Sequence, residues 1–221
     1  MNVLKIGIID DDETKVTQII TYLIKGWADA SAEKRTKYSE YQLEPVEIPL
    51  HSSLSDVLEY IAQVKVDCVL IDYRLSSYEN VNFTGINVAS ALSKQRHGFP
   101  IFILTAYEDE LYAKEVFDVY QVFNFDRYLN DANERIELNS KIIEQILKYR
   151  KEFLSWEQEL ANLLPRAGEN AATDARILQL DSYIENALDG THSIDTNVKH
   201  QLLSGKLDLL LEKLDKLIGK D

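Results

Sequence analysis

The chain has 221 residues, a formal net charge of −13 and 45% hydrophobic residues, a composition typical of a soluble globular protein. No run approaches the roughly 18 consecutive apolar residues of a membrane span. The apolar segment after Met1 ends in three aspartates and not in a signal-peptide cleavage site, so we expect a cytoplasmic protein. Both the first two-thirds and the last third are net acidic, which disfavours nucleic-acid binding.

The first two-thirds alternates short apolar runs with amphipathic segments, a pattern that predicts a parallel sheet covered by helices. The expected strands are Val3–Ile9, Val46–Leu50, Val66–Ile71, Pro100–Leu104 and a fifth within Val122–Leu129. The expected helices are Glu13–Ile24, Ser53–Ala62, one beginning within Ile86–Leu92, and Glu108–Val119. Polar residues 25–44 predict an irregular connection. We therefore expect an α/β fold with a doubly wound five-stranded parallel sheet, flavodoxin-like, in the order 2-1-3-4-5.

From Glu134 onward the pattern is wholly helical. It predicts a long helix, or two in line, that stops near Pro165, followed by helices over 173–188 and 195–218. We expect an α/β domain over residues 1–148 and an all-helical domain over 149–221. The leucine stripe from Leu202 to Leu217 is compatible with a homodimer through these helices, but it is too short to establish a coiled coil. The absence of a basic recognition helix argues against DNA-binding output.

Polar side chains follow three of the expected strands. Asp10, Asp11 and Asp12 follow the first strand, Asp72 the third and Thr105 the fourth. Ligands of open parallel sheets bind beyond the carboxyl ends of the strands, so these side chains should share one edge. Several carboxylates at one place need a cation, and their hard oxygens suit Mg²⁺. The pattern predicts a Mg²⁺-dependent phosphoryl site in which one carboxylate is the nucleophile.

Three motifs, at residues 5–12, 69–75 and 101–106, resemble those of response-regulator receiver domains. They match the first strand with its acidic pair, the strand that bears the phosphoacceptor, and the Thr/Ser-Ala step; the resemblance covers residues 3–148. It implies a two-component phosphorelay protein phosphorylated on Asp72 by a histidine kinase or phosphotransfer protein, with a partner protein as output. It implies that Asp11, Asp72 and the backbone carbonyl of Arg74 are Mg²⁺ ligands and that Asp10 acts on the metal through a water. It also implies that Thr105 is the hydroxyl that switches towards the phosphoryl group and that Tyr128 is the aromatic residue whose position reports on this switch.

The chain departs from the receiver pattern at two places. Ser76 replaces a proline, and the loop over 76–84 is lengthened before Gly85, which matches a family glycine. The family lysine after the fifth strand is missing: the matching position falls near Asp131, and Arg127 is the nearest cation. Its loss removes a charge-assisted contact to phosphate. A degenerate, unphosphorylated receiver that serves as a docking module is therefore an alternative.

A second alternative is a haloacid-dehalogenase-like phosphatase. Residues 10–14 fit that family's Asp-x-Asp-x-Thr pattern, with Asp10 as nucleophile and Asp12 as general acid. Thr105 fits its second motif, and Asp126 with Asp131 could imitate its late acidic pair. This interpretation leaves Asp72 without a role. Simpler explanations also exist, because Asp12 could merely cap the following helix and Tyr128 could be a core residue.

Overall fold

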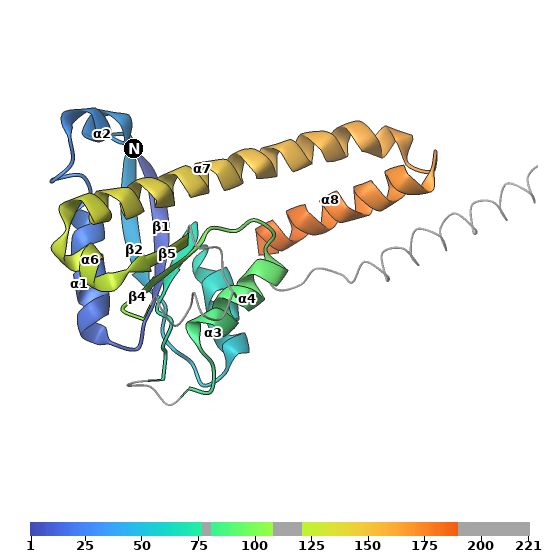
Figure 1. Cartoon of the computed structure of the whole chain (residues 1–221). Helices are drawn as coiled ribbons and strands as arrows, with labels where there is room; N and C mark the ends of the chain where they lie inside the picture. The colour runs from blue at the N-terminus through green and yellow to red at the C-terminus, as the bar shows by residue number, and fades with distance from the viewer. Residues whose placement is uncertain (77–80, 108–120, 190–221) are drawn as a thin grey trace, which may run out of the picture. The chain divides into compact units, whose positions relative to one another are not determined.

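The computed structural model describes residues 1–76, 81–107 and 121–189 (Figure 1). The strands of its sheet are β1 (Asn2–Ile9), β2 (Tyr41–Glu47), β3 (Cys68–Ile71), β4 (Ile101–Thr105) and β5 (Val122–Asn124). They pair in parallel in the order β2-β1-β3-β4-β5, which confirms the predicted topology. The helices expected over 108–119 and 195–218 lie outside the described residues.

Helices cover both faces of the sheet. On one face, α1 (Glu13–Lys25) and the first part of α7 (Ala132–Leu163) bury apolar side chains such as Ile19 and Ile142 against β1, β3 and β4. On the other face, α3 (Leu54–Val64) and α4 (Gly85–Gln95) do the same. Every residue of β3 and β4 is buried, as expected of central strands covered on both sides.

The region of the second strand differs from the prediction. β2 starts earlier than expected and ends at Glu47, so it shares only Val46 and Glu47 with the expected strand Val46–Leu50. A short helix, α2 (Ala32–Lys37), interrupts the polar segment expected to be irregular. Pro45 lies inside β2, opposite Ile6 of β1. A proline is tolerated there because β2 is an edge strand and needs only one set of ladder hydrogen bonds.

The fifth strand lies within the predicted segment Val122–Leu129, of which it occupies only the first three residues. β5 ends at Asn124, whose side chain accepts a hydrogen bond of 2.9 Å from the backbone N–H of Arg127 and so caps α6 (Phe125–Asn130). Tyr128, expected near the end of the strand, lies on this helix instead. The aromatic residues of the segment favour a strand, but the capping asparagine begins a helix before they can extend it.

The chain divides into two compact units, residues 1–152 and residues from 153 onward, and α7 crosses the boundary. In the second unit, η2 (Leu164–Arg166) follows α7 and leads to α8 (Ala171–Asp189). Arg176 donates two hydrogen bonds of 2.7 Å to the carboxylate of Glu159, and the ring centroids of Trp156 and Tyr183 lie 5.3 Å apart. These contacts fold α8 back onto the end of α7, which confirms the helical C-terminal region.

Among the helices that the structure describes, none combines the length and the apolar character needed to cross a bilayer.

Candidate functional site

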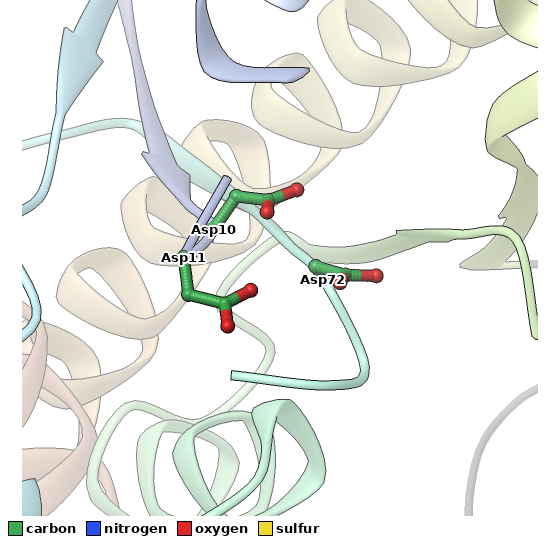
Figure 2. Close-up of side chains that lie close together, drawn as sticks. All are labelled: Asp10, Asp11 and Asp72. Carbon is green, nitrogen blue, oxygen red and sulfur yellow. The ribbon is translucent and has the colours of Figure 1, made fainter. Parts of the chain in front are cut away.

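Three carboxylates meet at the carboxyl ends of β1 and β3 (Figure 2). Asp10, Asp11 and Asp72 each contribute an oxygen, and these oxygens lie within 4.8 Å of one another. The two strands are neighbours in the sheet, and the backbone N–H of Asp72 donates a hydrogen bond of 2.8 Å to the carbonyl of Ile9. The side chains therefore converge because the parallel pairing ends at the same level in both strands.

Asp12, the fourth acid of the sequence pattern, has a different task. Its Oδ1 accepts hydrogen bonds from the backbone N–H groups of Thr14 at 2.9 Å and Lys15 at 3.4 Å. These bonds satisfy two of the free N–H groups that begin α1, so Asp12 is the N-cap of this helix.

The acidic cluster is buried, and part of its hydrogen-bonding capacity is unused. Asp72 is 3% exposed and Asp11 is 8% exposed. Oδ1 of Asp10 accepts a hydrogen bond of 2.9 Å from the backbone N–H of Asp12. Oδ2 of Asp10 and Oδ1 of Asp72, both buried, accept none from the residues that the structure describes. Buried carboxylate oxygens are costly without a partner, and a hard divalent cation such as Mg²⁺ would satisfy them.

Burial also disfavours the charge of the cluster. It raises the pKa of Asp10 to about 7, and the neighbouring Asp72 carboxylate adds to this effect. The pKa of Asp72 is raised for the same reason, although Lys15 and the hydroxyl of Thr105 oppose the shift. The site therefore favours a ligand that brings positive charge and keeps both carboxylates ionised.

Lys15, in the first turn of α1, supplies one such charge. Its Nζ lies 3.2 Å from Oδ2 of Asp72 and 4.0 Å from Oδ2 of Asp10, and its side chain is only 20% exposed. Partial burial works against the charge of Lys15, but the carboxylates outweigh it and raise the pKa of its ammonium. Lys15 was not among the residues predicted from the sequence. The sequence feature that could have indicated a role for Lys15 is its position in the first turn of a helix, where the helix dipole disfavours positive charge.

The cations considered from the sequence occupy other positions. β5 ends at Asn124, so the residue directly after the fifth strand is Phe125 and not Asp131. Asp131 instead lies at the C-terminal end of α6, and the side chain of Arg127 is exposed on that helix.

Gly85 fixes the backbone beside Asp72. Its N–H donates a hydrogen bond of 3.0 Å to the carbonyl of Tyr73 at the start of α4. A Cβ atom at this position would lie 1.9 Å from the carbonyl oxygen of Asp72 and 2.9 Å from Cγ2 of Ile71. Only glycine permits this approach, so the helix start and the backbone of Asp72 are held against each other.

The end of β4 places Thr105 close to the cluster. Thr105 is fully buried, and its Oγ1 accepts a hydrogen bond of 3.2 Å from the backbone N–H of Tyr107. The guanidinium of Arg74, in the loop after β3, lies 3.7 Å from the ring centroid of Tyr107. This cation–π contact joins the loops that follow Asp72 and Thr105.

Tyr128 is a core residue in this structure. It is 1% exposed, and its ring makes an edge-on contact with Tyr22 of α1 at a centroid distance of 5.9 Å. Its role as the aromatic that reports on Thr105 remains a prediction.

Comparisons with known proteins describe the fold. No family model and no curated protein matches the chain. Among solved structures, it is similar to a two component transcriptional regulator AraC of Clostridium phytofermentans (16% identity, TM-score 0.46, 66% of this chain and 98% of that one). It is also similar to the BeF3-activated receiver domain of Klebsiella pneumoniae RstA (20% identity, TM-score 0.39, 61% of this chain and 97% of that one). A third is the anti-anti-sigma factor PhyR of Bartonella quintana (15% identity, TM-score 0.41, 69% of this chain and 50% of that one). Several of the similar solved structures are receiver domains. At these identities the likeness concerns the fold alone.

Proposed function

We propose that the chain is a response-regulator receiver that accepts a phosphoryl group on Asp72 from a histidine kinase or phosphotransfer protein. The observation that carries the proposal is the buried cluster of Asp10, Asp11 and Asp72, in which two carboxylate oxygens accept no hydrogen bond from the described residues. Such a cluster at the carboxyl edge of a parallel sheet suits a divalent cation and a phosphoryl group.

Asp10, Asp11, Asp72 and the backbone carbonyl of Arg74 would hold Mg²⁺, which, when bound, neutralises negative charge on the carboxylates and on phosphoryl oxygens. Asp72 is the nucleophile. One of its oxygens forms the bond to phosphorus, the bond between phosphorus and the donor breaks, and the leaving group keeps that electron pair. The hydroxyl of Thr105 favours the charged form of Asp72 before transfer and would donate to a phosphoryl oxygen afterwards.

Intact-protein mass spectrometry after incubation with Mg²⁺ and acetyl phosphate tests the proposal. We expect one phosphoryl adduct on the wild-type protein and none on Asp72→Asn. Asp12→Asn is a matched control, because asparagine caps a helix as well as aspartate does, and this variant should form the adduct at the wild-type rate. An adduct that survives in Asp72→Asn would refute the proposal.

The same measurement separates the two alternatives. A phosphatase would release phosphate continuously, would need Asp12 as its general acid and would tolerate loss of Asp72. The helix cap formed by Asp12 does not support this function. A wild-type protein that forms no adduct and releases no phosphate would be a docking module.

We propose that the output is contact with a partner protein, through the receiver or the C-terminal helices, with a homodimer as one form. The net negative charge of both parts of the chain supports protein over nucleic acid as the target.

A further inference from the structure

We propose that Lys15 supplies, from the first turn of α1, the positive charge that receivers draw from a lysine after the fifth strand, and that its ammonium contacts the phosphoryl group on Asp72. The inference deepens the proposed function and rests on it. Nζ of Lys15 already faces the cluster, 3.2 Å from Oδ2 of Asp72 and 4.0 Å from Oδ2 of Asp10.

The surroundings of Lys15 tie it to the end of the fifth strand. Its Nζ lies 5.5 Å from the centre of the ring of Phe125, the first residue after β5. The ammonium therefore lies among the ends of β1, β3 and β5. A lysine placed directly after β5 would have its backbone at the position of Phe125. A lysine there and Lys15 on α1 would therefore both bring an ammonium to the same group of carboxylates.

The helix itself gives no reason for a lysine at this position. Lys15 is the third residue of α1, where free backbone N–H groups and the helix dipole favour negative charge. Lys25, in the last turn of the same helix, occupies the end where a cation is favoured. The attraction of the buried carboxylates compensates for the unfavourable position of Lys15 in the helix dipole. The phosphoryl group would be attached to one of these carboxylates, that of Asp72.

Phosphorylation increases the negative charge that Lys15 faces. Transfer converts the Asp72 carboxylate, with one negative charge, into an acyl phosphate that carries about two near neutral pH. The ammonium remains protonated and exchanges its contact with a carboxylate oxygen for one with a phosphoryl oxygen. A charge-assisted hydrogen bond of this kind is roughly twice as strong as a neutral one, so its loss should weaken binding of a phosphoryl group by about tenfold or more.

The test compares wild type, Lys15→Met and the control Lys25→Met, whose lysine lies over the ring of Tyr22 away from the cluster. Beryllofluoride, a stand-in for the phosphoryl group, is titrated in the presence of Mg²⁺ and followed by fluorine NMR; Mg²⁺ alone is titrated by calorimetry. We expect Lys15→Met to bind beryllofluoride at least about tenfold more weakly and Mg²⁺ no more weakly than wild type does. The Lys25→Met variant should match wild type in both.

A chemical rescue guards against a variant that merely misfolds. Cys68 is fully buried, so the thiol of Lys15→Cys can be alkylated selectively with 2-bromoethylamine, which restores an ammonium at nearly the same distance from the backbone. Alkylation should recover most of the lost beryllofluoride affinity. Failure of the alkylated protein to recover would overturn the inference.

The outcomes also separate this inference from the proposed function. If wild type binds beryllofluoride and Lys15→Met binds it equally well, Lys15 is only a charge partner of the metal-free cluster, and this inference alone is overturned. If wild type forms neither a beryllofluoride complex nor a phosphoryl adduct, the proposed function fails, and this inference fails with it.

Discussion

Replacing Gly85 by alanine sets two opposed effects against each other. Alanine is a better helix former than glycine, by up to about 1 kcal/mol in a helix interior, and Gly85 is the first residue of α4. The new Cβ would, however, lie 1.9 Å from the carbonyl oxygen of Asp72, so one of the two backbones must move. Overpacking of this kind costs about 1–3 kcal/mol and occasionally more, so we expect a net loss of stability of about 1–3 kcal/mol.

The displaced backbone belongs to Asp72, the proposed phosphoacceptor, so we expect the rate of phosphorylation to fall more than stability does. A misplacement of about 1 Å at a reacting group can slow a reaction about a hundredfold. Urea unfolding followed by circular dichroism gives the stability, and the rate of adduct formation with acetyl phosphate gives the second quantity. The two together distinguish a local displacement from general destabilisation.

Gly168→Ala is the matched control. Gly168 has a φ of +86°, and a Cβ added there would meet no other atom within 4 Å, so alanine costs only backbone strain of about 1 kcal/mol. This variant should lose stability but form the adduct at the wild-type rate. If Gly85→Ala instead matched wild type in both stability and rate, the close approach of α4 to Asp72 would be refuted.

Three further predictions concern the site and its supports. In metal-free protein the free energy of unfolding should fall by at most about 4 kcal/mol as pH rises from about 4 to about 7. Folding raises the pKa of Asp10 from 3.8 to about 7, so in this pH range the native state holds a proton that the unfolded state has released. Saturating Mg²⁺ or Asp10→Asn should flatten this dependence, and urea titrations that show stability rising between about pH 5 and about pH 8 would contradict it. Asp12→Ala should cost about 1 kcal/mol through loss of the α1 cap while Asp12→Asn costs little; equal losses in urea titrations of the two variants would rule out the capping role. Arg135 donates to the carbonyls of Tyr128 and Leu129 at the end of α6, so Arg135→Met should cost about 1.5–3 kcal/mol in thermal or urea unfolding, and an unchanged midpoint would count against these bonds.

The sequence was sufficient for the strand order of the sheet and for the acids that lie close together at its edge. The runs that become β3 and β4 are apolar on both faces. Such a run predicts a buried central strand without reference to the rest of the chain, because the character of each residue is enough. In a parallel sheet all strands end at one edge, so aspartates after β1 and β3 had to come close together. The capping role of Asp12 was also foreseen as one possibility, since it depends only on the next three residues.

Competition between local signals limited the prediction of β2 and β5. Aromatic and β-branched residues between Val122 and Leu129 favour a strand, but the side chain of Asn124 caps a helix inside that segment. Residues 25–44 were expected to be irregular, yet β2 begins at Tyr41, and Pro45 is acceptable inside it because β2 pairs on one side only. Strand pairing is a property of the assembled sheet and cannot be read from either segment alone.

The sequence by itself determined which acids gather at the sheet edge, and the tertiary structure alone decided which cation faces them. Lys15 follows the acidic run closely, yet its contact with Asp72 spans 57 positions in the chain and depends on how α1 leaves β1. A lysine side chain is long and flexible, so its position follows from the surrounding charges and packing and not from its place in a motif. Gly85 is a second example. The sequence shows a glycine at this position, but the reason that only glycine fits there is the close approach of α4 to the carbonyl of Asp72 in the folded protein.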